Sequence, residues 1–88
     1  MTMINSTITT GGSAQTVFTP DANRPMVAWM VRNESAGDLR VTDNGTAPAT
    51  STGILIKAGE AYEEVRPGRG PLQIWGATTS QAFSAKVW

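Results

Sequence analysis

The sequence contains no cysteine and no histidine. The missing cysteines exclude disulfides and thiolate metal sites, and the missing histidines remove the commonest metal ligand in proteins. Acid–base and nucleophilic catalysis would then fall to carboxylates, lysine, tyrosine or serine. Glu63 and Glu64 are adjacent, so on a strand they point to opposite faces and cannot share a substrate. We therefore expect no enzyme activity, no metal and no cofactor.

A net charge is also absent, because seven basic and seven acidic residues cancel and are scattered along the chain. Sequence-independent nucleic-acid binding depends on a basic surface, which this composition does not supply. No apolar run approaches the roughly 20 residues that cross a bilayer. The N-terminus lacks the basic and apolar regions of a signal peptide. We expect no nucleic-acid partner, no membrane partner, and synthesis in the cytoplasm of the producing cell.

The length of 88 residues predicts one small domain with a thin stability margin. Small domains gain stability from disulfides, metals or self-association. Because the first two find no support in the composition, self-association is the expected compensation.

The longest apolar run extends from Met26 to Val31. Neither of its two alternating faces is polar, which fits a strand covered on both sides or a short buried helix. Pro25 opens the segment, and Asn33 and Gly37 close it, so the space favours a strand. A cover for the second face would have to come from this domain or from a neighbouring subunit.

No segment has sustained helical periodicity, and short β-type segments recur about every ten residues along the chain. This pattern predicts an all-β fold, a small antiparallel β-sandwich or barrel of seven to eight short strands. Residues 1–10 are expected to form an extended N-terminal arm, and residues 11–88 a single β-sandwich domain. Glu34–Gly37 and Arg66–Gly70 have the length and composition of hairpin connections. The expected core residues are Phe18, Leu39, Ile54, Ile74, Phe83 and Val87.

Two tryptophans are candidates for a partner or subunit interface. Trp75 alternates with Leu72 and Ile74, and Trp88 alternates with Val87, so both indoles are predicted on outer faces. Exposed tryptophans anchor protein partners or stack against sugars. Ordinary partial burial is the alternative for both.

Arg66 and Arg69 form the most concentrated basic feature, on a glycine-rich turn. They could hold a phosphate or an acidic patch of a partner, and a charged hairpin loop is the plainer interpretation. In the N-terminal arm, Ile4 and Ile8 are the apolar residues expected to contact a neighbouring subunit. Asp38 and Asp43 do not have the ligand spacing of a calcium loop.

Three segments resemble small virion structural proteins of tailed bacteriophages. They are Thr9–Phe18, the stretch from Asn23 through Val31, Asn33 and Ser35 to Leu39, and the closing segment Gly76–Trp88. The likeness covers most of the chain from about Thr9 onward and includes no catalytic motif.

The resemblance implies a capsid decoration (cement) protein that binds and stabilises a preformed phage head. Its implied partners are itself, as a homotrimer, and the major capsid protein, and its implied location is the capsid surface of the virion. The arm of residues 1–10 would complete the sheet edge of a neighbouring subunit. The alternative is a fibre or tail accessory module that binds a partner protein or a host-surface glycan. Neither role requires a small-molecule substrate.

Overall fold

The protein is described by a computed structural model covering residues 1–67 and 69–88. The described residues form eight β-strands and no helix, which confirms the predicted all-β class. The strands are β1 (Thr2–Thr7), β2 (Gln15–Phe18), β3 (Trp29–Asn33), β4 (Leu39–Thr42), β5 (Ile54–Ile56), β6 (Ala61–Glu64), β7 (Leu72–Gly76) and β8 (Ala82–Val87).

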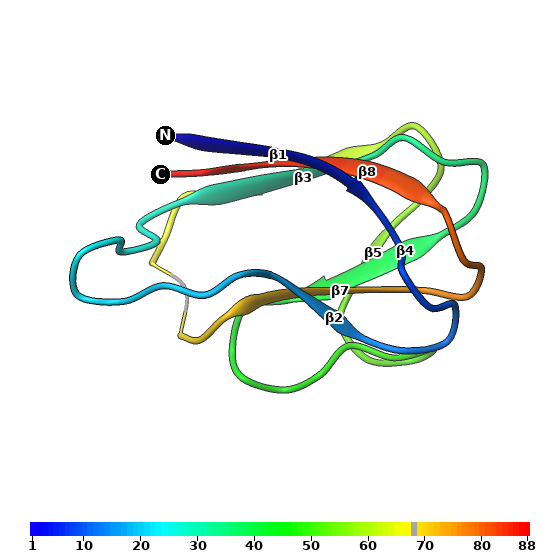
Figure 1. Ribbon diagram of the computed structural model, residues 1–88, viewed down its shortest axis with the longest axis horizontal. Helices are drawn as coiled ribbons and strands as arrows, with labels where there is room; N and C mark the ends of the chain where they lie inside the picture. Colours follow the sequence, from blue (N-terminus) through cyan, green and yellow to red (C-terminus); the bar gives the residue numbers. More distant parts are fainter. Residues whose placement is uncertain (68) are drawn as a thin grey trace.

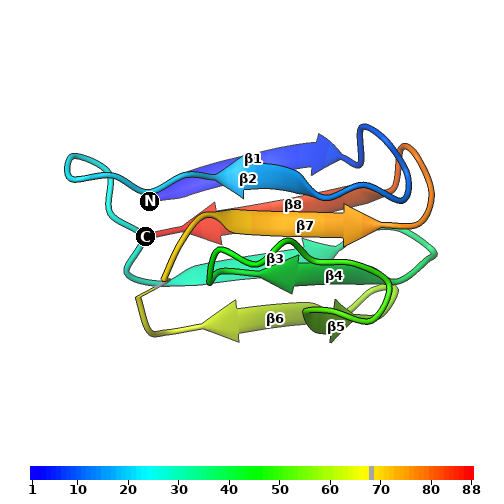
Figure 2. The same cartoon turned by 90° about the horizontal axis from the view of Figure 1, so that it is seen from below.

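These strands form two four-stranded antiparallel sheets that pack face to face as a sandwich. Sheet A has the order β1-β8-β3-β6, and sheet B has the order β2-β7-β4-β5. Figure 1 shows the two layers, and Figure 2 shows each strand of sheet A lying over one strand of sheet B. The predicted sandwich is therefore confirmed, whereas the described residues do not close into the alternative barrel.

Each strand of the first half of the chain pairs with the strand at the same position counted back from the end of the chain. Antiparallel partners are β1 with β8, β2 with β7, β3 with β6, and β4 with β5. The chain is thus one long hairpin, with its tip between β4 and β5, wound so that its arms alternate between the two layers. This is the jelly-roll topology of β-sandwiches. Pairing of β3 with β8 and of β4 with β7 completes the sheets.

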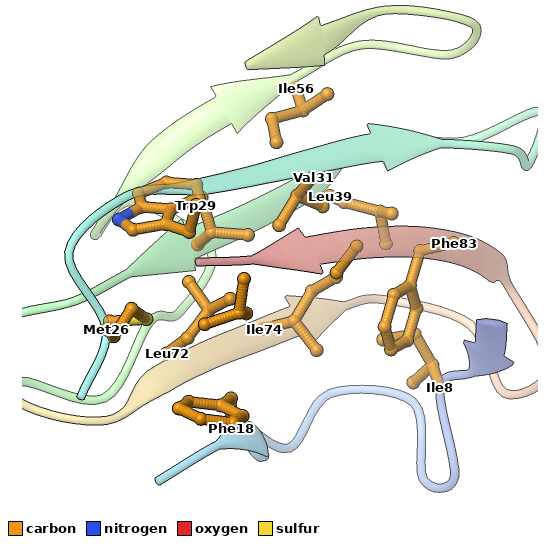
Figure 3. Packing of buried hydrophobic residues seen from close by; sticks show 13 residues of the cluster. Ile8, Phe18, Met26, Trp29, Val31, Leu39, Ile56, Leu72, Ile74 and Phe83 are labelled. Atoms are coloured by element: carbon orange, nitrogen blue, oxygen red, sulfur yellow. The ribbon is translucent and has the colours of Figure 1, made fainter. Parts of the chain in front are cut away.

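Inward-facing side chains from alternate strand positions fill the space between the sheets (Figure 3). Trp29 is the largest fully buried side chain, and its indole N–H donates to the carboxylate of Asp43 at 2.9 Å. Its ring packs against Tyr62, with 5.5 Å between centroids. The predicted core is confirmed for Phe18, Leu39, Ile74, Phe83 and Val87, and Ile54 is partly buried against it.

The run from Met26 to Val31 differs from the prediction. Strand β3 begins only at Trp29, and Val27 before it is 51% exposed. Trp29 and Val31 face the core, while Met30 on the other face is half-buried. The strand therefore packs on one face, and the residues described by the structure supply no second layer for its other face. The long apolar run arises because Met26, which is buried, and Val27, which lies in a bend, precede the strand directly.

The N-terminal segment also differs from an arm that reaches another subunit. Residues 2–7 form β1, an edge strand that pairs in regular register with β8 of the same chain. Ile4 packs against the core, and Ile8 is fully buried in it. These two isoleucines hold the segment on its own domain, because each removes apolar surface from water there.

Two predicted hairpins are in fact crossovers between the layers. Glu34–Gly37 leaves β3 of sheet A and enters β4 of sheet B, and the turn that begins at Arg66 joins β6 of sheet A to β7 of sheet B. Gly68 in that turn lies outside the described residues. The connection between β4 and β5, which begins at Asp43, does join neighbouring strands of one sheet. Composition marked the turns, but it carries no information on which layer the next strand joins.

A polar network fixes the crossovers at the end of the sandwich away from the termini. Asn33 is fully buried, and its side-chain amide donates to the carbonyls of Gly37 at 2.6 Å and Ile56 at 2.9 Å. Its carbonyl oxygen accepts from the backbone N–H and the hydroxyl of Ser35. Gln81 extends the network by donating to the Ser35 hydroxyl. Among the described residues, no buried side-chain N or O atom lacks a hydrogen-bond partner.

Candidate interaction surfaces

The two adjacent glutamates of β6 are separated by the strand geometry. Glu63 and Glu64 point to opposite faces of β6, as their alternating exposure shows. In the described part of the chain, no group of three or more Asp or Glu side chains is placed to hold a metal ion. Glu64 is instead engaged by its neighbours, accepting from the Tyr62 hydroxyl at 3.3 Å and pairing with Arg66 at 3.3 Å.

Tyr62 lies half-buried on β6, between the ring of Trp29 and the carboxylate of Glu64. Burial raises its pKa above the usual 10.0, and the negative charge of Glu64 and their hydrogen bond raise it further. A tyrosine whose pKa is raised stays protonated at neutral pH. It therefore acts as a hydrogen-bond donor beside the Trp29 ring rather than as a general base.

The predicted interface residues occupy different parts of the surface. Trp75 lies half-buried on the outer face of β7 in sheet B. Trp88 is 40% exposed at the end of the sandwich where both termini lie (Figure 1). Ile4 is partly buried on the inner side of β1.

Ile8 requires a correction as an interface candidate. It follows β1, where its N–H donates to the carbonyl of Gln81 at 2.9 Å, and its side chain is fully buried. A side chain without exposed surface in the single chain is a core residue.

Arg66 and Arg69 line a hollow of about 360 Å³ together with Asp43 and Glu64. The backbone N–H of Arg69 donates to the carbonyl of Asp43 at 2.8 Å. Because two carboxylates share the hollow with the two guanidinium groups, its attraction for a phosphate is small. This arrangement favours the plainer interpretation, a charged turn that connects the layers.

The most pronounced surface feature is an apolar patch around the chain termini, which we call the terminal patch. Six large hydrophobic side chains are exposed among the described residues, and five of them gather at this end. The terminal patch consists of Met1 (70% exposed), Met3 (59%), Val27 (51%), Val65 (74%) and Trp88 (40%). The sixth, Leu55, lies on sheet B.

The register of sheet A explains why Met1, Met3, Val65 and Trp88 lie on one face of the sheet. One row of paired residues crosses the sheet with its buried members facing the core: Thr2, Val87, Trp29 and Glu64. The residues one step nearer the termini face outward, because side chains alternate along a strand. They are Met1, Trp88, Ala28 and Val65. The next outward row consists of Met3, Lys86, Met30 and Glu63, so two charged side chains border the patch between methionines.

Sequence reasoning found Trp88 but missed the other members of the terminal patch. The available signal was the continuation of the strand alternation beyond the strand ends, which places Met1 and Val65 on the same side as Trp88. That signal becomes readable only once the order of the strands in sheet A is known.

A second surface feature lies on the outer face of sheet B. Arg40 is paired across the sheet with Trp75 on one side and with Leu55 on the other. The guanidinium of Arg40 donates to the carbonyl of Gly53 at 3.0 Å, which holds it in place. These side chains line an open hollow of about 290 Å³ that also includes Asp38. We call it the sheet B hollow.

No protein-family model, no curated protein and no solved structure was found to match this chain. The residues that the structure describes contain no helix that is long and apolar enough to cross a membrane.

Proposed function

We propose that this chain is a structural virion protein, a capsid decoration protein that binds a preformed phage head as a homo-oligomer. The observation that carries the proposal is the terminal patch. Soluble monomers rarely gather large exposed hydrophobic side chains at one end without using them, and apolar residues bordered by charged ones are common in protein interfaces. The resemblance of the sequence to small phage virion proteins supplies the identity of the partner.

Two further observations support a structural role. The described carboxylates are dispersed or paired, as expected for a scaffold rather than a catalyst. The jelly-roll topology is one that viral capsid domains use, although lectins use it too, so this support is by analogy. Binding would gain strength from repetition, because an oligomer that engages several capsid subunits at once multiplies a modest contact.

Replacing two members of the terminal patch tests the proposal. A chain carrying Val65→Ser and Trp88→Ser is expected to bind heads that lack this protein at least about tenfold more weakly. Burying one such side chain contributes about 1.5–3 kcal/mol, and 1.4 kcal/mol corresponds to a factor of ten. Cosedimentation of purified protein with those heads measures the change.

Leu55→Ser is the matched control, because it removes an exposed hydrophobic side chain from the other sheet. It should bind heads as the unaltered chain does. Unchanged binding of the double variant, or an equal loss in the control, would contradict the role of the terminal patch.

The sheet B hollow favours a second candidate function, a fibre or tail module that binds a host-surface glycan. An indole offers a stacking face for a sugar ring, and the neighbouring Arg40 and Asp38 offer a donor and an acceptor for its hydroxyls. Host polysaccharide is then expected to quench tryptophan fluorescence, and Trp75→Ala is expected to weaken the affinity about tenfold. Absence of quenching across a panel of host glycans would exclude this function.

A further inference from the structure

The four strands at the sheet edges differ in how well they are protected against pairing with another chain. The edges are β1 and β6 in sheet A, and β2 and β5 in sheet B. An edge strand presents unpaired N–H and C=O groups, and soluble proteins protect such edges with short strands, bulges, charges or proline.

Three of the four edge strands have one of these protecting features. Strand β5 is three residues long. Strand β2 has a register shift between Thr16 and Phe18, which interrupts a regular hydrogen-bonding edge. Strand β6 ends with two negative charges, Glu63 and Glu64.

Strand β1 carries none of them. It has six residues, Thr-Met-Ile-Asn-Ser-Thr, without a charge or a proline, and it keeps one register with β8 from Thr2 to Thr7. Figure 2 shows it along the open side of sheet A. It is thus the longest, most regular and least protected edge among the described strands.

The backbone groups that β1 offers can be assigned from its pairing. Ile8 and Gln81 form the next pair after Thr7 and Ala82, which end the register of β1 with β8. The N–H of Ile8 donates to the carbonyl of Gln81 at 2.9 Å, so Ile8 points its backbone groups toward the β8 side. Hydrogen bonding alternates along an antiparallel strand, so the even-numbered residues of β1 bond to β8. The N–H and C=O groups of Met3, Asn5 and Thr7 therefore point to the open edge.

We propose that β1 pairs antiparallel with β1 of a second copy of this chain across a two-fold axis. The pairing joins two four-stranded sheets into one continuous sheet. Centred on Ile4, it places Ile4 opposite its own symmetry mate on the inner face, and Met3 opposite Asn5 of the second copy on the outer face. Met3 and Asn5 then exchange the N–H and C=O groups that face the open edge.

Strand β1 of a second copy fits this edge better than strand β6 of a second copy does. Strand β1 is uncharged, so two β1 strands meet without like-charge repulsion. Pairing β1 with β6 of another copy would place Glu63 beside a strand that has no cation to offset its charge. Isologous pairing is also the commonest symmetry of homo-oligomers.

The two-fold axis has a consequence for the terminal patch. Because the axis is perpendicular to the sheet, the outer faces of both sheets A stay on the same side. Both terminal patches then face one surface, which allows bivalent attachment to a repeating partner. This last step rests on the proposed function, whereas the pairing of the two β1 strands does not.

Asn5→Pro tests the pairing. Proline removes an N–H that faces the open edge and places its ring where the incoming strand would lie, while the bonds to β8 stay intact. We expect association of the variant to weaken at least about tenfold. Glu63→Pro is the matched control, because it removes an N–H that faces the open side of β6, the opposite edge of the same sheet. Sedimentation velocity over a concentration series, without phage heads, measures the mass of each protein.

The unaltered chain and Glu63→Pro are expected to form a reversible two-chain species, and Asn5→Pro a single chain. Circular dichroism checks that Asn5→Pro is folded, and Asn5→Lys, which keeps the N–H but adds an edge charge, provides a second disrupting variant. A single chain at every concentration for the unaltered protein would overturn the pairing. So would a three-chain particle in all the proteins, the state that the phage resemblance implies. If the chain carrying Val65→Ser and Trp88→Ser loses head binding but keeps the two-chain mass, the result supports both the role of the terminal patch and the pairing of the β1 strands.

Discussion

Replacing Trp29 with alanine is expected to lower the free energy of unfolding by about 3–5 kcal/mol. Trp29 is fully buried, and its truncation removes the largest side chain of the core together with its contact to the Tyr62 ring. The loss also leaves the carboxylate of Asp43 without the indole N–H that donates to it. Domains of this size have roughly 5–15 kcal/mol of stability in total, so the variant should be close to unfolding.

Urea denaturation followed by circular dichroism measures this loss, and Trp88→Ser is the matched control. Trp88 is 40% exposed, so its replacement should change the free energy of unfolding by less than about 1 kcal/mol. Equal losses in the two variants would show that Trp29 does not have the special place in the core described above.

Asn33→Ala is expected to lower the free energy of unfolding by about 2–4 kcal/mol. The substitution removes the buried donor to the carbonyl of Ile56 and one of the two donors to the carbonyl of Gly37, and it removes the acceptor of the Ser35 N–H. A buried polar group that loses its partner costs about 1–3 kcal/mol. Since the network spans the crossover from β3 to β4, the loss acts on both sheets.

Asn33→Asp separates hydrogen bonding from shape, because the carboxylate keeps the volume but cannot donate to either carbonyl. It should be at least as destabilising as Asn33→Ala at neutral pH, where it also places a charge in a buried site. Asn23→Ala, at an exposed turn position, is the control and should be nearly neutral. Chemical denaturation of the three variants checks this, and nearly neutral Asn33 variants would contradict the structural role of the network.

The all-β class, the sandwich and most of the core could be predicted from the sequence because they depend on local alternation. Phe83, Ala85 and Val87 alternate with polar residues in β8, and Leu39 and Val41 do so in β4, as expected for strands with one buried face. The apolar run before β3 was misleading, because alternation cannot distinguish a second covered face from exposed residues such as Val27.

The layer order could not be predicted, and the terminal patch depends on it. Val65 and Met1 are far apart in sequence, and they lie on the same face and at the same end only because β1, β8, β3 and β6 form one sheet. The role of Asn33 was hidden for the same reason, since Ile56 is brought to it from another strand. The sequence signalled a turn near Asn33 and Ser35 but not a buried network.

The structure also changes how the N-terminal segment should be tested. Deleting residues 1–10 would remove β1 and the buried Ile8 along with any contact to a neighbour. A loss of head binding in that variant would then report unfolding as much as a lost interface. Single substitutions at outward-facing positions avoid this problem.

A reconstruction of the virion at a resolution that identifies strands tests the central claim most directly. The account predicts jelly-roll density on the outer surface of the head, with the terminal patch against the major capsid protein. Density for this chain in the tail or fibre, or a head contact made through the sheet B hollow instead of the terminal patch, would contradict it.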